Sequence, residues 1–157
     1  MKVTNEDPAV VNCYTDGSKD EIGRTGAAFI SKCLDSSCRV KGFFPLGPTT
    51  SVYQAEATAI CQAAWVMLKN GTSGKTVNFY VDNQGVIQAV SKLEIKDKLI
   101  IETKLSVNNS VVLNWIPGHE GYRGNEIADR LAKRATRMPW IGCLPSMPVS
   151  SDQGRNA

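Results

Sequence analysis

Acidic residues close two of the β-type runs in this chain. Asp16 follows the run 10–15, and Asp82 follows the run 76–81. In α/β sheets, ligands bind beyond the carboxyl ends of parallel strands. If these two strands are parallel neighbours, their terminal carboxylates lie side by side at one edge of the sheet. The alternative is that each Asp serves only as a turn former, which is its usual role after a strand.

Two further acids occupy the apolar sides of predicted helices. Glu56 is expected in the first turn of a helix, and steps of three and four residues from it reach Ala59, Ile60 and Ala63. Asp129 also has apolar neighbours, in the last predicted helix. A lone buried carboxylate is costly, so each needs a cation or a proton. Simpler roles remain open, namely an interaction with the helix dipole for Glu56 and an ion pair with Arg130 or Lys133 for Asp129.

Convergence of the four acids would create a metal site. Carboxylates gathered at one point repel one another strongly unless cations lie between them. Oxygen ligands suit hard divalent ions, Mg²⁺ first and Mn²⁺ second. Two such ions, about 3.5–4 Å from each other, stabilise the attacking and leaving oxygens of a phosphoryl displacement. The chemistry expected is therefore phosphoryl transfer with two Mg²⁺ ions, held by Asp16, Glu56, Asp82 and Asp129.

The remaining charges favour a polyanionic substrate. The chain has 18 Lys and Arg against 15 Asp and Glu, for a net charge of +3, and setting the four acids aside leaves +7. A basic stripe with helical spacing is either a solvated face or a contact for phosphates; it comprises Arg130, Lys133, Arg134 and Arg137. Trp65 and Trp115 are expected in the core rather than as platforms for bases.

His119 is the only histidine, and it lies in a glycine-flanked segment that leads into the helix of Asp129. Its imidazole could reach the leaving group or a departing metal ion; an inert loop histidine is the alternative. With one histidine and five cysteines that lack Cys-x-x-Cys spacing, a zinc site is not expected. The cysteines indicate small buried thiols in a reducing cell interior.

The elements that must position these residues follow a mixed α/β pattern. Three β-type runs separated by turn residues predict an antiparallel meander, and Ser51 and Gln54 have the spacing of a capping box before a helix. The predicted strands cover 10–15, 26–30, 38–44, 76–81 and 111–116, and the helical patterns cover 55–69, 84–91, 97–105 and 125–136. We predict an α/β fold with a five-stranded mixed sheet, three antiparallel strands followed by parallel ones, flanked by helices.

Proline density separates the body of the chain from its end. Residues 8–136 are expected to form one domain, and 137–157 a Pro/Ser-rich tail or linker. No apolar run approaches the roughly 18 residues of a membrane span, so no membrane association is expected. The first ten residues lack the apolar stretch of a secretory signal, which predicts an intracellular location, nucleus or cytoplasm.

Five motifs in this order resemble the type 1 ribonuclease H family. They are Tyr14-Thr15-Asp16-Gly17-Ser18, Gln54-Ala55-Glu56, Tyr80-Val81-Asp82-Asn83, Asn114-Trp115-Ile116-Pro117-Gly118-His119 and Gly124-Asn125-Glu126-Ile127-Ala128-Asp129. The residues at 51–56 and the proline-bearing tail look most like the domain found in non-LTR retrotransposon polyproteins. The resemblance implies a ribonuclease H-like fold and an endonuclease that hydrolyses the RNA strand of RNA–DNA hybrids, leaving 5′-phosphate and 3′-hydroxyl ends.

The resemblance also implies roles for individual residues. Asp16, Glu56, Asp82 and Asp129 match the metal ligands, and His119 matches an auxiliary proton shuttle. Ser51 stands where the family has a phosphate-contacting Thr. Val52-Tyr53 replaces a polar pair that related enzymes place in the RNA minor groove. Recognition of RNA is therefore assigned to the loop after Asp16, with Gly17 and Ser18, or to Gln54 and Gln84.

One departure concerns partners, because no Trp-rich basic helical insertion lies between 91 and 110. A linked reverse transcriptase domain of a parent polyprotein, or another partner, could then supply affinity for the hybrid. Two alternative functions stay open: a non-catalytic scaffold that binds hybrids, and a nuclease of the same fold that acts on DNA. The complete set of four acids speaks against the first, and the segment Trp115–His119 against the second.

Overall fold

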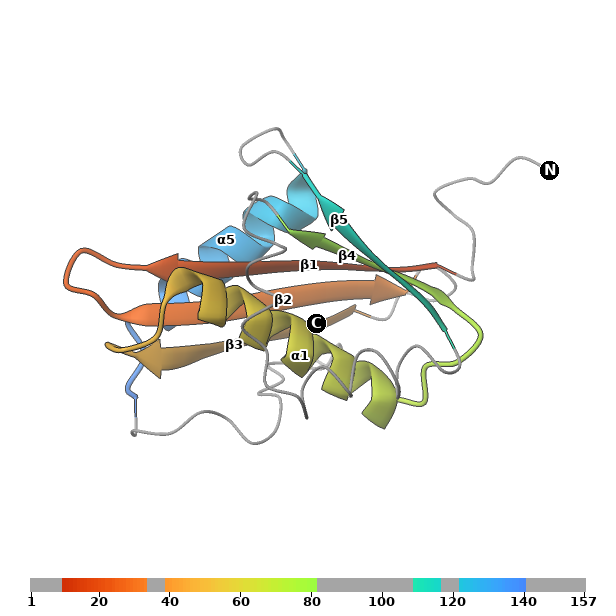
Figure 1. Cartoon of the computed structure of the whole chain (residues 1–157), viewed down its shortest axis with the longest axis horizontal. Helices are drawn as coiled ribbons and strands as arrows, with labels where there is room; N and C mark the ends of the chain where they lie inside the picture. The colour runs from red at the N-terminus through yellow and green to blue at the C-terminus, as the bar shows by residue number, and fades with distance from the viewer. Residues whose placement is uncertain (1–9, 34–38, 82–108, 117–121, 141–157) are drawn as a thin grey trace.

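The computed structural model describes residues 10–33, 39–81, 109–116 and 122–140 (Figure 1). The predicted helical segments 84–91 and 97–105 lie outside these residues. The same holds for three of the predicted site residues, Asp82, Gln84 and His119.

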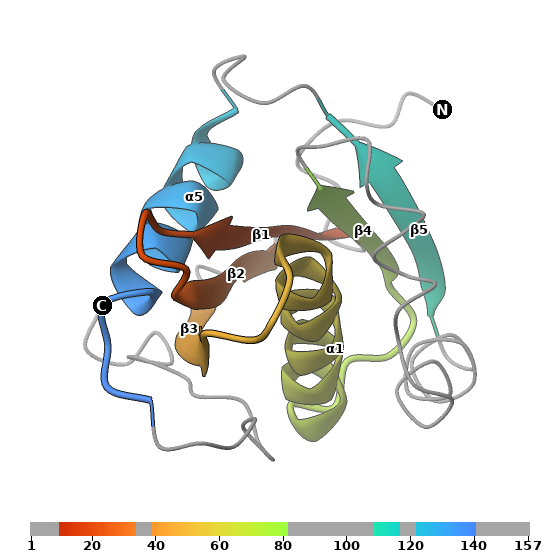
Figure 2. The same ribbon diagram turned by 60° about the vertical axis from the view of Figure 1, so that its left-hand side comes forward.

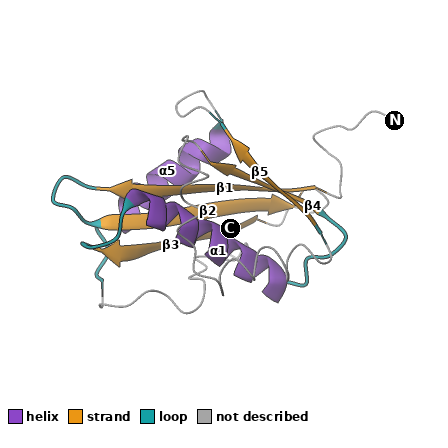
Figure 3. Ribbon diagram, viewed as in Figure 1, coloured by secondary structure: helices purple, strands orange, loops and turns teal. Residues whose placement is uncertain are grey.

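The described residues form a five-stranded mixed sheet with two helices (Figure 3). The elements are β1 (Val10–Lys19), β2 (Thr25–Cys33), β3 (Arg39–Gly47), α1 (Val52–Lys69), β4 (Thr76–Val81), β5 (Ser110–Trp115) and α5 (Arg123–Ala135). The strand order is β3-β2-β1-β4-β5. β1 and β3 are antiparallel to β2, whereas β4 runs parallel to both β1 and β5. The predicted mixed sheet is therefore confirmed.

β1 is longer than its sequence pattern predicts. It pairs with β4 only as far as Thr15, which lies opposite Val81, but it pairs with β2 through to Lys19. The prediction that this strand ends at Asp16-Gly17 is wrong, because hydrogen bonding to β2 carries the strand across both residues. Asp16 is thus the first residue of β1 beyond the last described pair with β4.

The two helices lie on opposite faces of the sheet (Figure 2). A Cβ atom at Gly17 would lie 2.8 Å from the Val52 carbonyl oxygen of α1. A Cβ atom at Gly26 would lie 2.6 Å from the Ala132 carbonyl oxygen of α5. Gly26 pairs with Ser18, the neighbour of Gly17, and adjacent residues of a strand face opposite sides. α1 and α5 therefore sandwich β1 and β2, and each comes close enough to touch the backbone.

The larger part of the core lies between the sheet and α1. Its largest fully buried apolar side chains are those of Phe29, Phe44, Phe79, Leu46 and Ile60. A smaller cluster beneath α5 joins Ala28, Leu131 and Ala132 to the partly buried Phe43 and Ile127. Burial of this apolar surface is the main force that holds both helices on the sheet.

Three minor expectations have different outcomes. The Trp65 side chain is 38% exposed, so its predicted place in the core is wrong. Cys13 and Cys61 are buried and outside any disulfide, as predicted for small buried thiols, and burial raises the pKa of the Cys13 thiol. Across the described part of the chain, no helix combines the length and apolar character that crossing a bilayer requires.

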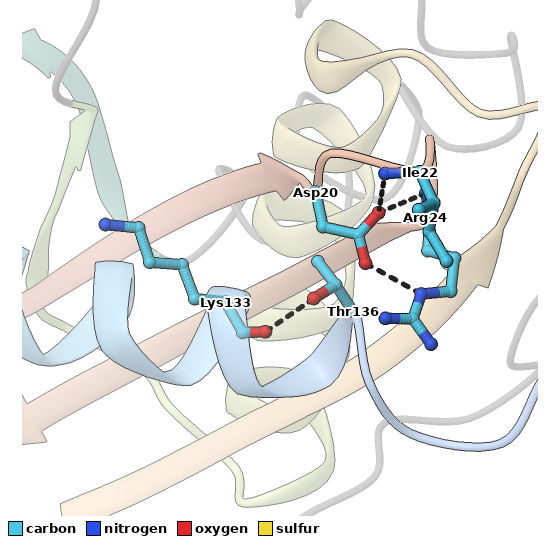
Figure 4. Close-up of polar contacts among 5 residues, drawn as sticks. All are labelled: Asp20, Ile22, Arg24, Lys133 and Thr136. Atoms are coloured by element: carbon cyan, nitrogen blue, oxygen red, sulfur yellow. Dashed lines mark hydrogen bonds and ion pairs between the residues drawn. The ribbon is translucent and has the colours of Figure 1, made fainter.

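Side-chain hydrogen bonds fix the turn between β1 and β2 (Figure 4). Asp20 Oδ1 accepts from the backbone N–H groups of Ile22 at 3.2 Å and Arg24 at 2.7 Å, and Oδ2 accepts from Arg24 Nε at 2.7 Å. Desolvation alone would raise the pKa of Asp20, but the hydrogen bonds and positive charge of Arg24 lower it overall. These contacts stabilise the turn.

The approach of α5 to β2 predicts a steric cost at Gly26. Changing Gly26→Ala should lower the free energy of unfolding by about 1–3 kcal/mol, because the new methyl group meets backbone atoms of α5. Lys32→Ala, at an exposed position of the same strand, is the matched control and should change it by less than about 0.5 kcal/mol. Urea unfolding followed by circular dichroism measures both. Equal stability of the two variants would contradict the packing described here.

Candidate active site

Asp16 is almost completely buried on the α5 face of β1. Its side chain is 3% exposed, and it pairs with Ala28 of β2. Ala28 packs against Leu131 and Ala132, so the residue beside it also faces α5. Asn12 and Tyr14 face the same side as Asp16, since alternate residues of a strand share one face.

Glycine contacts show which turn of α5 lies beside Asp16. A side chain at Gly124 would collide with the Tyr14 ring, so the start of α5 lies over Tyr14. Further along, Gly26, the partner of Ser18, touches Ala132. Asp16 lies between Tyr14 and Ser18 on this face, so the intervening turns of α5 pass beside it. Asp129 lies on those turns.

The Asp129 side chain is already engaged by a neighbour on α5. Its Oδ2 lies 3.0 Å from Lys133 Nζ, and the two side chains are 29% and 62% exposed. The ion pair weighed from sequence is therefore present. A pair this exposed is worth at most about 1 kcal/mol, so Lys133 does not prevent Asp129 from taking another cation.

Glu56 approaches the same part of β1 from the opposite face. Its side chain is 0% exposed, which confirms that it lies on the apolar side of α1. The prediction that it occupies the first helical turn is wrong, because the helix starts at Val52 and Glu56 is its fifth residue. A Cβ atom at Gly17 would lie 3.0 Å from the Glu56 backbone nitrogen, so α1 contacts β1 directly beside Asp16.

The pairing of β4 with β1 fixes the position at which the chain continues to Asp82. Tyr14 and Tyr80 lie opposite each other, and their rings stack with centroids 4.8 Å apart. Asn12 Oδ1 accepts hydrogen bonds from Asn78 Nδ2 at 3.2 Å and Tyr80 Oη at 3.3 Å. β4 ends at Val81, and Asp82 is the next residue along the chain.

Tyr14 and Tyr80, which pair across β1 and β4, stay neutral near pH 7. Burial raises the pKa of Tyr14, and the Tyr80 and Tyr122 phenols raise it further. Burial also raises the pKa of Tyr80, again with a contribution from Tyr122. The Tyr14 and Tyr80 phenols are therefore uncharged, and they add no negative charge beside Asp16.

Elements from three parts of the chain thus meet around the point where pairing between β1 and β4 stops. β1 brings Asp16, α1 brings Glu56 and α5 brings Asp129. Among the residues that the structure describes, no three Asp, Glu, His or Cys side chains form a metal-binding group. The predicted quartet also includes Asp82, and this residue and His119 lie outside the described ranges.

Sequence reasoning passed over Asn125, which lies one helical turn before Asp129. Its side chain is 3% exposed, and Oδ1 has no hydrogen-bond partner among the described residues. An unsatisfied buried acceptor costs about 1–3 kcal/mol, so this amide is a candidate for contact with a bound group. The signal was present in the sequence, because Asn125 shares the apolar helical side of Ala128 and Ala132.

The described residues that were predicted to bind substrate lie in two places, the start of α1 and the end of β1. Ser51 and Gln54 form the predicted capping box: Ser51 Oγ accepts from the Gln54 N–H at 3.1 Å, and Gln54 Oε1 accepts from the Ser51 N–H at 3.0 Å. Gly17 and Ser18 are not in a loop, contrary to the prediction, because they belong to β1 and pair with Ala27 and Gly26.

Comparisons with known proteins agree with this architecture. Residues 8–137 match a family model described as RNase H. The structure is similar to that of RNase H1 from the archaeon Halobacterium salinarum NRC-1, with a TM-score of 0.60 and 19% identity, covering 80% of this chain and 96% of that one. It is also similar to the N-terminal RNase H domain of a Mycobacterium tuberculosis protein, solved as a fusion with maltose-binding protein, with a TM-score of 0.61 and 21% identity, covering 81% and 98%.

Proposed function

The chain belongs to the RNase H family, and we propose that it hydrolyses the RNA strand of RNA–DNA hybrids, leaving 5′-phosphate and 3′-hydroxyl ends. One observation carries this proposal. β1, α1 and α5 bring the segments that hold Asp16, Glu56 and Asp129 to the point where β4 ends, one residue before Asp82. Each acid alone has a simpler explanation, but the approach of all three acid-bearing segments to one end of β4 supports a shared role.

The residues at this point fit divalent metal ions. Asp16 and Glu56 are buried carboxylates, 3% and 0% exposed, and buried carboxylates favour a cation nearby. Their hard oxygen donors suit Mg²⁺, with Mn²⁺ as a substitute. When bound, two such ions supply an activated water and stabilise charge on the scissile phosphate. The residues proposed to hold them are Asp16, Glu56, Asp82 and Asp129.

His119 and Lys133 are the basic groups proposed to work beside these acids. His119 lies four residues before the first residue of α5. In the proposed role its imidazole moves a proton at the leaving oxygen, because its ordinary pKa lies near neutral pH. Lys133 holds Asp129 at 3.0 Å and reduces repulsion among the four carboxylates.

The start of α1 is the proposed contact with a substrate phosphate. The capping box uses the acceptor atoms Ser51 Oγ and Gln54 Oε1. The Ser51 hydroxyl hydrogen and the Gln54 amide group remain as donors, and phosphate oxygens are acceptors. Ser51 is therefore assigned to the phosphate. The minor groove of the RNA strand is assigned either to backbone groups of Gly17 and Ser18 or to Gln54 and Gln84.

The wider setting of the domain is also part of the proposal. We assign residues 8–136 to the catalytic domain and 137–157 to a tail or linker. A non-LTR retrotransposon polyprotein is the proposed source, in which a linked reverse transcriptase domain would make the hybrid that this domain degrades inside the cell. The sequence between 91 and 110 carries no Trp-rich basic insertion, so linkage would strengthen binding to the hybrid.

A cleavage assay with three labelled substrates of one sequence tests the proposed function. With Mg²⁺, the protein should cut the RNA strand of an RNA–DNA hybrid but neither an RNA duplex nor a DNA duplex. Asp16→Asn should reduce the rate by about 10³-fold or more, since several kcal/mol of charge stabilisation is lost. Asp20→Asn, which alters an acid of the β1–β2 turn, is the control and should cleave normally.

Two results of that assay would contradict the proposal. Binding of the hybrid by the unaltered protein without cleavage would favour the scaffold function. Cleavage of the DNA duplex would favour a nuclease that acts on DNA.

A pair of variants separates the structural role of Ser51 from its proposed role in binding. Ser51→Ala removes both the cap and the donor, so it should lower the free energy of unfolding by about 1 kcal/mol and weaken hybrid binding. Ser51→Asp keeps a good cap but places a negative charge against the phosphate, so it should preserve stability and weaken binding more. Chemical unfolding and fluorescence anisotropy measure the two quantities. Unchanged binding by Ser51→Asp would exclude Ser51 as a phosphate contact.

A further inference from the structure

An arginine stripe runs along the exposed side of α5. Its members recur after seven, four and three residues, a spacing that keeps them on one side of a helix, and all are exposed: Arg123, Arg130, Arg134 and Arg137. Arg137 follows the last residue of α5, but its N–H donates to the Arg134 carbonyl oxygen at 3.1 Å, so the turn continues through it. The proposed catalysis uses none of these four residues.

Basic residues of β2 and β3 extend this stripe across the sheet. Phe43 of β3 belongs to the cluster beneath α5. Lys41 and Arg39 lie two and four residues before Phe43, so they face the same side as α5, and Lys32 of β2 pairs with Arg39 on that side. These three residues and the four arginines are called the α5–β3 basic surface below.

A contact between Arg134 and Phe43 joins the two parts of the surface. The guanidinium carbon of Arg134 lies 5.4 Å from the centroid of the Phe43 ring. A guanidinium held over a ring face keeps its N–H donors available at its edges. The stripe on α5 is therefore anchored next to β3 rather than projecting independently into solvent.

The charge of this surface is one-sided. Residues 123–137 contain five basic and two acidic side chains, and one of the acids, Asp129, pairs with Lys133. The described residues of β2 and β3 contain no Asp or Glu. Basic side chains therefore outnumber acidic ones in the described elements that form this face.

The length of the stripe and its arginine content favour one class of anion over others. It extends over 15 residues, or about 20 Å for the 14 steps of roughly 1.5 Å between Arg123 and Arg137. One strand of a duplex presents a phosphate about every 3.4 Å along its axis, so the stripe matches a length of about six phosphates. Arginine also favours phosphate over other anions, because its planar fork can donate two parallel hydrogen bonds. A linear polyphosphate fits this surface better than a small anion does.

We propose that the α5–β3 basic surface binds the phosphate backbone of nucleic acid, as a contact separate from the candidate active site. This contact goes beyond the proposed hydrolysis and does not depend on it. It would hold nucleic acid outside the scissile segment and contribute affinity without reading sequence.

Binding measurements without metal test this contact separately from cleavage. The probes are a fluorescein-labelled 24-base-pair RNA–DNA hybrid and a DNA duplex of the same sequence, titrated at several salt concentrations. Arg130→Gln/Arg137→Gln removes two charges and spares Arg134 and its packing. Lys69→Gln/Lys75→Gln is the matched control, with the same loss of net charge near the junction of α1 and β4. Arg130→Lys/Arg137→Lys keeps the charge.

The arginine-to-glutamine pair should weaken binding of both probes by about tenfold at 0.1 M salt. It should also reduce the slope of log K against log salt by roughly 2, because two phosphate contacts are lost. The control and the lysine pair should keep the original slope. If the control loses as much affinity, the change in net charge alone explains the effect. If the arginine-to-glutamine pair leaves binding unchanged, the surface is a solvated face or a face that binds protein. Either result overturns the proposal, whether or not the protein cleaves hybrids.

Discussion

The described structure depends on close approach to β1, the central strand, from both faces. Gly17 lets the start of α1 come to backbone distance of β1, Gly26 lets α5 do so at the neighbouring β2, and Gly124 of α5 lies against the Tyr14 ring of β1. A methyl group at any of these positions would meet backbone atoms or an aromatic ring. Without side chains at these points, the two helices reach the part of β1 that holds Asp16. The location of Glu56 and Asp129 follows from this packing, because neither is near Asp16 in sequence.

Much of the fold could be predicted because its local patterns agree with its tertiary structure. The alternating runs became β-strands, and the capping box at Ser51 sets the start of α1. Errors arose where contacts distant in sequence decide the outcome. Pairing with β2 extends β1 through Gly17 and Ser18, although both are typical turn residues. The partial exposure of Trp65 likewise depends on which side of α1 meets the sheet, and composition alone does not determine that.

The candidate site likewise has features that the sequence predicts and features that it does not. Acids at strand ends and on apolar helical sides can be found from sequence, since a buried carboxylate conflicts with its surroundings. Asn125 was missed because an uncharged amide among apolar residues gives a weaker signal. The ion pair of Asp129 with Lys133 follows from helical spacing and was anticipated. The contact of Arg134 with Phe43 joins α5 to β3, so no local pattern could have predicted it.

In the proposed site, acids from four segments of the chain bind divalent ions together. Calorimetric titration of the unaltered protein with Mn²⁺ measures this without any nucleic acid. Saturable binding should be weakened or lost in each of four single variants: Asp16→Asn, Glu56→Gln, Asp82→Asn and Asp129→Asn. A variant at Asp20, whose carboxylate is committed to the β1–β2 turn, should bind as the unaltered protein does. If any one of the four variants binds Mn²⁺ with unchanged affinity and stoichiometry, that acid lies outside the site and the account of a shared metal centre is wrong.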